Sequence, residues 1–204
     1  MTSQLLLGTK NRGKIVELRD LLRGARDLHL LTLADHPFSD VDESGGTFLE
    51  NALLKARSIC SEAGMPVLAE DAGLEVAALG GAPGIRSARF SGEPADYARN
   101  NALLLEKLRG VTDRRARFVA VSVLWLPDGE VFVTSGVLSG RIAAASRGSG
   151  GFGYDPLFVP EGETRTLAEI STGEKNLTSH RAKSMARMAL ILESLIEEGA
   201  LATP

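Results

Sequence analysis

The chain has 204 residues, of which 44% are hydrophobic, 24% charged and 5% aromatic, and this composition excludes a collagen, a disulfide-rich scaffold and a disordered tail. With 23 basic and 26 acidic side chains the net charge is −3, which disfavours a duplex nucleic-acid binder, because phosphate recognition needs a basic excess. The sequence predicts neither a membrane span nor a signal peptide, and its single cysteine, Cys60, favours a reducing compartment. We therefore expect a cytoplasmic protein.

The apolar patterns predict alternating strands and helices in the first half of the chain and a β-hairpin in the middle. In chain order the expected elements are a strand at 4–7, a helix from about 14, a helix from 47, a strand at 66–69, a helix at 97–108, paired strands at 117–126 and 130–137, a short strand at 157–159 and a helix at 179–198. Thr47 and Glu50 have the spacing of a capping box. This order indicates an α/β protein with a mixed sheet.

The segment from Gly8 to Lys14 has the spacing of a phosphate-binding loop between a strand and a helix. Backbone N–H groups at a helix N-terminus, together with Lys10, Arg12 and Lys14, would form an anion site. Ile15 stands where such a loop needs Ser or Thr for Mg²⁺, so either the metal is held elsewhere or the protein is not a P-loop NTPase. The simpler interpretation of the segment is an ordinary strand–turn–helix with surface lysines.

Acidic residues supply the second candidate group. Glu70 and Asp71 follow a predicted strand, and if the strand continues their side chains point to opposite faces, so that one of them serves a given site. Glu43 lies in a polar, glycine-flanked loop. One carboxylate from each segment is enough for Mg²⁺, which takes its remaining ligands from phosphate and water, although acids in loops are more often simply solvated.

A glycine-rich segment, 149–156, carries two aromatic side chains, Phe152 and Tyr154, which can stack on a base. Further along, His180 and Arg181 open the last predicted helix, where cations are unfavourable unless an anion or an acceptor group faces them. Both segments favour a binding site, although a flexible loop and exposed polar residues are the simpler alternatives.

Taken together, the motifs resemble those of the inosine/xanthosine triphosphate pyrophosphatase family over nearly the whole chain. The matching segments are 9–14 (TKNRGK), 46–52 (GTFLENA), 70–74 (EDAGL), 80–85 (GGAPGI), 151–156 (GFGYDP) and 179–181 (SHR). Two positions depart from the family pattern. Lys10 replaces a usual glycine, and Ala72 replaces a usual serine, so that any substrate contact at Ala72 must come from its backbone.

The resemblance implies an α/β fold with a long mixed β-sheet, helices on both sides and two lobes around a central cleft, residues 1–204 forming a single pyrophosphatase domain and a homodimer. It implies Mg²⁺-dependent hydrolysis of ITP, dITP and XTP to the monophosphate and diphosphate, with Asp71 as metal ligand and proton acceptor and Glu43 as the second metal ligand. The residues that it implies for substrate binding are Thr9, Lys10, Asn11, Arg12, Gly13, Lys14, Lys55, Ala72, Phe152, Gly153, Tyr154, Asp155, Lys175, His180 and Arg181.

Three other functions remain open. A P-loop-type NTPase would release orthophosphate, and Ile15 argues against it. A Maf-like pyrophosphatase would share the chemistry and act on other nucleotides. A nucleotide-binding regulator without turnover would need cations more than the carboxylates at Glu43 and Asp71.

Overall fold

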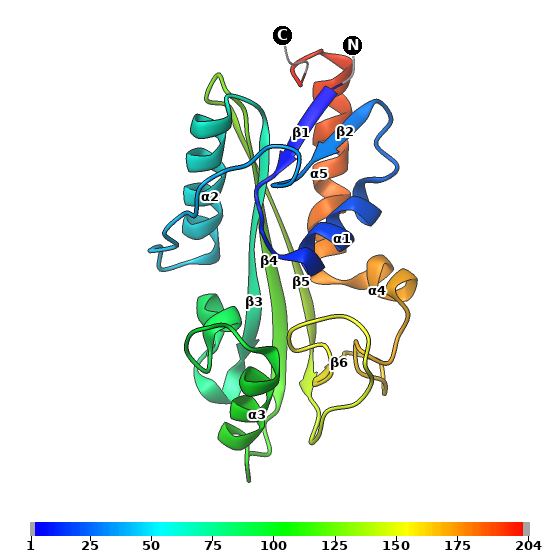
Figure 1. Cartoon of the computed structure of the whole chain (residues 1–204). Coiled ribbons are helices and arrows are strands. Elements are labelled where there is room, and N and C mark those ends of the chain that lie inside the picture. The colour runs from blue at the N-terminus through cyan, green and yellow to red at the C-terminus, as the bar shows by residue number, and fades with distance from the viewer. Residues whose placement is uncertain (1–2, 202–204) are drawn as a thin grey trace. The chain divides into compact units, whose positions relative to one another are not determined.

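The computed structural model describes residues 3–201 and contains six strands and five α-helices within them (Figure 1). Their bounds are β1 (Ser3–Leu7), α1 (Arg12–Leu22), β2 (Leu28–Leu31), α2 (Phe48–Ala63), β3 (Val67–Val76), α3 (Tyr97–Lys107), β4 (Arg115–Trp125), β5 (Val131–Ile142), β6 (Phe158–Pro160), α4 (Thr172–Thr178) and α5 (His180–Glu197). Two 3-10 helices, Ala77–Leu79 and Gly84–Arg89, follow β3.

The strands form one mixed sheet in the order β2-β1-β3-β4-β5-β6. β1 pairs in parallel with β2 and with β3, whereas β5 and β6 are antiparallel. Parallel neighbours need a crossover, and α1 and α2 are the helices that follow β1 and precede β3. The mixed α/β fold expected from the sequence is confirmed.

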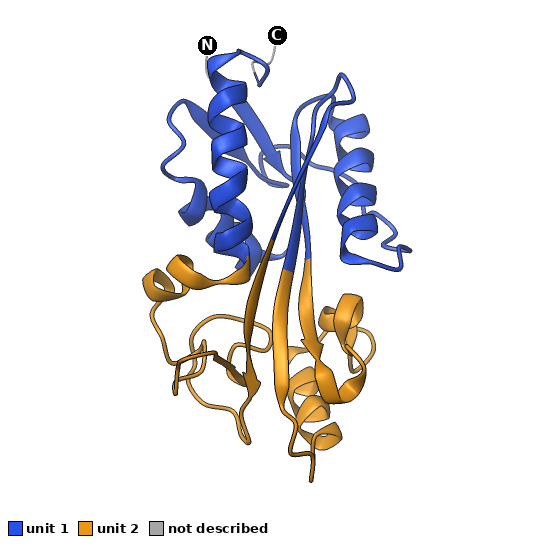
Figure 2. Ribbon diagram, turned by 180° about the vertical axis from the view of Figure 1, so that it is seen from behind, with its two compact units in different colours: residues 1–71, 120–135, 181–204 blue, residues 72–119, 136–180 orange. Residues whose placement is uncertain are grey.

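The chain divides into two compact units, shown in blue and orange in Figure 2. Unit 1 comprises residues 1–71, 120–135 and 181–204, and unit 2 comprises residues 72–119 and 136–180. Two of the four boundaries between the units, at Asp71/Ala72 and at His180/Arg181, fall inside motifs that the sequence singles out.

In unit 1 the sheet is covered on both faces by helices, as a parallel sheet requires. Leu5, Leu7 and Leu68 point to one face and pack in a core with α1 and α5. Leu6 and Val67, one residue out of phase, point to the other face and pack against α2. Successive side chains of a strand point to opposite faces of a sheet. The same alternation places Glu70 and Asp71, which end the part of β3 in unit 1, on opposite faces.

Unit 2 has its own core on one face of its sheet segments. Leu74 of β3 and Phe118 of β4 pack there with Leu104 of α3 and with Leu108, the residue that follows α3. Phe118 also contacts the ring of Phe158, with centroids 4.7 Å apart.

Most elements agree with the sequence expectations. The capping box of Thr47 and Glu50 is present at the start of α2, and Cys60 is buried with a free thiol. The end expected at 69 for the strand at 66–69 is wrong, because this strand, β3, continues through Glu70 and Asp71 to Val76. The sequence analysis also missed β2, α4 and the 3-10 helices.

Candidate active site

The loop between β1 and α1 is built by local side-chain hydrogen bonds. The Asn11 side chain caps α1 by accepting from the Lys14 N–H at 3.2 Å, and the Thr9 hydroxyl accepts from the Asn11 N–H at 3.2 Å. Arg12 and Gly13 therefore form the first turn of the helix, whose N–H groups have no intrahelical partner and favour an anion. The Lys10 ammonium is not aimed at this turn in the structure, because it donates to Asp40 at 2.8 Å.

Glu70 and Asp71, adjacent on β3, point to opposite faces of the sheet. Glu70 is fully buried and accepts from the Arg181 guanidinium at 2.7 to 3.2 Å. Lys14 lies on the same side, with its Nζ 3.2 Å from the Glu70 carbonyl oxygen and 3.4 Å from the carboxylate. Burial lowers the pKa of Lys14, and Glu70 acts against that effect.

On the other face, Asp71 faces α2. Its carboxylate accepts from Lys55 Nζ at 3.0 Å, and the same ammonium donates to Glu43 at 2.9 Å. Asn51, also buried, lies 3.5 Å from Asp71 and accepts from the Gly45 N–H at 2.8 Å. Burial raises the pKa of Asp71 above its ordinary value, while Lys55 and Lys14 lower it. A carboxylate with a raised pKa is a better proton acceptor near neutral pH.

These donors fit a magnesium ion that is shared with a substrate. Glu43 and Asp71 converge on a single cationic group, the Lys55 ammonium, so the position between them already favours positive charge. The part of the chain that the structure describes holds no group of three or more His, Cys, Asp or Glu side chains suited to a metal. Two carboxylates nevertheless suffice for Mg²⁺, because it keeps several waters and binds phosphate oxygens.

In unit 2, two of the expected residues, Phe152 and Lys175, donate to the carboxylate of a third, Asp155. Asp155 accepts from Lys175 Nζ at 2.6 Å and from the Phe152 N–H at 2.8 Å. The Lys175 ammonium lies 5.1 Å from the centroid of the Phe152 ring, over its face. Gly151 has φ +69°, and a Cβ there would stand 2.0 Å from the Asp155 carboxylate, so the loop can close on Asp155 only with glycine at this position.

Two other expected residues of unit 2 belong to its core. Tyr154 is buried in the core of unit 2, its hydroxyl donates to the Ser87 carbonyl at 2.9 Å, and burial raises its pKa. The His180 ring stacks on Phe118 with centroids 4.8 Å apart. Of the two aromatic side chains in the glycine-rich loop, Phe152 is the half-buried one and so the better candidate for stacking on a base.

Two expected site residues remain, Gly153 and Ala72. Gly153 presents its carbonyl to the Asn101 side chain at 3.0 Å. Ala72 is a half-buried residue of β3, directly after Asp71. Glu17, which is buried beside Arg181, was not expected from the sequence, and Asn51, which is buried, was left out of the expected site residues as a weaker candidate at the helix surface. The sequence feature that could have identified Glu17 is its position three residues after Lys14, which puts both side chains on one face of α1.

Tyr154→Phe is expected to lower the free energy of unfolding by about 1 kcal/mol, because the Ser87 carbonyl loses a buried donor. It should leave kcat/KM unchanged, since the ring packs in the core. Phe152→Ala should instead raise KM roughly tenfold with little loss of stability, as expected for a lost base–aromatic stack. Urea denaturation and steady-state kinetics on both variants check this, and a Tyr154→Phe defect confined to KM would contradict the core assignment.

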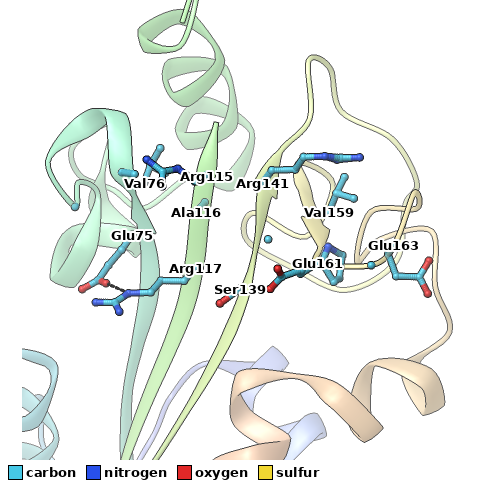
Figure 3. A pocket seen from close by; sticks show the side chains of 15 residues that line it. Glu75, Val76, Arg115, Ala116, Arg117, Ser139, Arg141, Val159, Glu161 and Glu163 are labelled. Carbon is cyan, nitrogen blue, oxygen red and sulfur yellow. Dashed lines mark hydrogen bonds and ion pairs between the residues drawn. The ribbon is translucent and has the colours of Figure 1, made fainter. Parts of the chain in front are cut away.

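Unit 2 also contains a pocket of about 770 Å³, lined by Arg115 and Arg117 on β4 and Arg141 on β5. Figure 3 shows that these guanidinium groups do not converge: Arg117 turns to Glu75, its partner at 2.6 Å, whereas Arg141 points to the opposite side. Arg115 is held by the Asp113 carboxylate at 2.8 Å. The pocket therefore lacks the concentrated positive charge that a triphosphate needs.

The chain is similar to known proteins over most of its length. A sequence profile described as the Ham1 family matches residues 5–191. A dITP/XTP pyrophosphatase of Mycobacterium bovis is 48% identical over 200 residues, covering 96% of this chain and 98% of the relative. One of Deinococcus deserti is 47% identical over 185 residues, covering 91% of this chain and 87% of the relative.

Solved structures show the same similarity. A HAM1 protein from Coxiella burnetii superimposes with a TM-score of 0.86 at 36% identity, covering 94% of this chain and 99% of that one. The Ham1 protein of Staphylococcus aureus gives a TM-score of 0.84 at 39% identity, covering 94% and 98%. Of the helices within residues 3–201, none combines the length and apolar character that crossing a bilayer requires.

Proposed function

The chain belongs to the Ham1 family, and on this premise we propose that it is a hydrolase that converts the non-standard purine nucleoside triphosphates ITP, dITP and XTP to the monophosphate and diphosphate. The observation that carries the proposal is that Asp71 and Glu43 both accept from the Lys55 ammonium in unit 1, the same unit that holds the N-terminus of α1 and Lys14. Carboxylates and cations in this combination suit the attack of water on a phosphate better than they suit simple binding.

Mg²⁺ is the proposed cofactor, held by Asp71 and Glu43, and when bound it supplies charge neutralisation for the phosphate oxygens. Asp71 accepts a proton from a water aimed at the α-phosphorus. Lys14 and the N–H groups at the start of α1, together with Thr9 and Asn11, hold the phosphates. Lys55, whose ammonium donates to both carboxylates in the structure, would assist in binding the phosphates.

Base recognition is assigned to residues of unit 2. Phe152 provides a stacking face, and the Lys175 ammonium, which donates to Asp155 and lies over that ring, is an N–H donor beside it. A donor satisfied by the 6-oxygen of inosine or xanthosine is opposed by the amino group of adenine, which selects against ATP. Arg181 is also predicted to read this position, although its guanidinium in the structure donates to Glu70 and Glu17.

The assay is hydrolysis of ITP, dITP, XTP, ATP and GTP with Mg²⁺, with identification of the phosphorus product. Diphosphate from ITP, dITP and XTP, with little turnover of ATP, is the expected result. Orthophosphate would indicate a P-loop-type NTPase, hydrolysis of other nucleotides a Maf-like enzyme, and binding without turnover a regulator. We further propose that residues 1–204 act as one domain, as a homodimer in the cytoplasm, on small-molecule substrates and not on nucleic acid.

A further inference from the structure

A buried cluster of alternating charges lies beside the proposed phosphate site in unit 1. It consists of Lys14 and Glu17 on α1, Glu70 on β3 and Arg181 on α5, and the exposed fractions of these side chains are 14%, 7%, 0% and 2%. Two cations face two anions, so the cluster is neutral. Buried charges are costly unless each is paired with good geometry, which makes the arrangement sensitive to the loss of any member.

Arg181 is the residue that both acids share. Its Nε and Nη2 atoms donate to the Glu70 carboxylate, and its Nη1 atom donates to Glu17. Because the guanidinium is planar, two carboxylates at different edges fix its orientation as well as its position. Glu17 thus prevents Arg181 from turning about its contact with Glu70.

Glu70 in turn connects Arg181 to Lys14. Its Oε1 atom accepts from Arg181 Nη2 at 2.7 Å and lies 3.4 Å from Lys14 Nζ, while its carbonyl oxygen accepts from the same ammonium at 3.2 Å. The position of the Lys14 ammonium therefore depends on how Arg181 holds the Glu70 side chain.

We propose that Glu17 is a positioning residue of the hydrolytic reaction. By fixing Arg181 against Glu70, it places the Lys14 ammonium where this cation stabilises the transition state in which water attacks the α-phosphorus. This inference rests on the proposed function, because it takes Lys14 to bind the triphosphate. Glu17 itself touches no substrate.

Glu17→Gln separates positioning from charge, since it removes one negative charge and leaves the cluster positive. Charge alone would tighten the binding of an anionic substrate and lower KM. Displacement of Lys14 should lower kcat, and a misplacement of about 1 Å costs up to about 100-fold. We expect kcat for ITP to fall at least tenfold with KM unchanged or lowered. Asp20→Asn, which removes an acid elsewhere on α1, is the matched control and should change neither constant.

A double-mutant cycle tests whether Glu17 acts through Lys14. In a Lys14→Ala background, Glu17→Gln is expected to cause no further loss of kcat, because the group that it positions is absent. A role only in stability would instead leave the kcat of folded Glu17→Gln unchanged, and an independent catalytic role would make the two losses multiply. Either result would overturn the proposal, as would a raised KM with normal kcat.

Should Glu17→Gln fail to fold, Glu17→Asp keeps the charge and shortens the side chain by one methylene. Because the shorter side chain should still displace the Lys14 ammonium, we expect a smaller fall in kcat, and no fall in the Lys14→Ala background. A normal kcat for Glu17→Asp would contradict the proposal. Wild-type protein that releases no diphosphate from ITP would refute the proposed function, whereas active wild type with an unaffected variant would refute only the role of Glu17.

Discussion

Asp71→Asn is expected to lower kcat for ITP hydrolysis by about 100-fold or more, the usual contribution of a general base, with a further loss from weaker metal binding. Asparagine keeps the shape of the side chain but cannot accept the proton. Its amide also replaces one carboxylate oxygen opposite the Lys55 ammonium, which keeps Glu43 as its partner. Steady-state kinetics with diphosphate detection measures the loss.

Asp42→Asn is the matched control, because Asp42 is an exposed acid in the same loop as Glu43. It should retain the kcat of the wild type. A folded Asp71→Asn variant with near-normal turnover would show that Asp71 is not the proton acceptor, and the base would then have to be sought among the other acids.

Arg181→Ala is expected to lower the free energy of unfolding by about 3–5 kcal/mol, the cost of leaving buried charges without their partner. Burial lowers the pKa of Arg181, but Glu70 and Glu17 outweigh this and raise the pKa above its ordinary value. The substitution leaves the carboxylates of Glu70 and Glu17 in the interior, where Lys14 Nζ lies 3.4 Å from Glu70. Urea denaturation of the variant and the wild type gives the difference.

Arg187→Ala provides the comparison for that measurement. Arg187 is an exposed arginine on the same helix, and its Nη1 atom donates to the Ser135 carbonyl. Its loss should cost less than about 1 kcal/mol, the range of surface substitutions. Equal effects of the two substitutions would mean that the charge cluster around Arg181 contributes nothing beyond an ordinary surface contact.

Local signals in the sequence determined much of the framework. The capping box of Thr47 and Glu50, the hairpin around Asp128 and the apolar stripe of α5 depend on residues close together in the chain, so their patterns can be read directly. The order of the elements was enough to predict a mixed α/β sheet. The motifs marked Lys14 and Asp71, two residues that the fold places in one unit.

The tertiary structure alone decided how far β3 extends and which groups its charged side chains contact. Glu70, Asp71 and Gly73 are poor strand formers, so the sequence indicates an end there, but partners from α1, α2 and α5 satisfy the two carboxylates within the sheet.

The tertiary structure alone also decided that Glu17, an acidic residue of a helix, and Tyr154, an aromatic residue of a loop, are buried. The residues next to them in the sequence do not indicate this burial. A charged or aromatic side chain has one local pattern whether it faces solvent, substrate or core. Its role is fixed by the partners that fold against it, and those come from segments as distant as Arg181 is from Glu17.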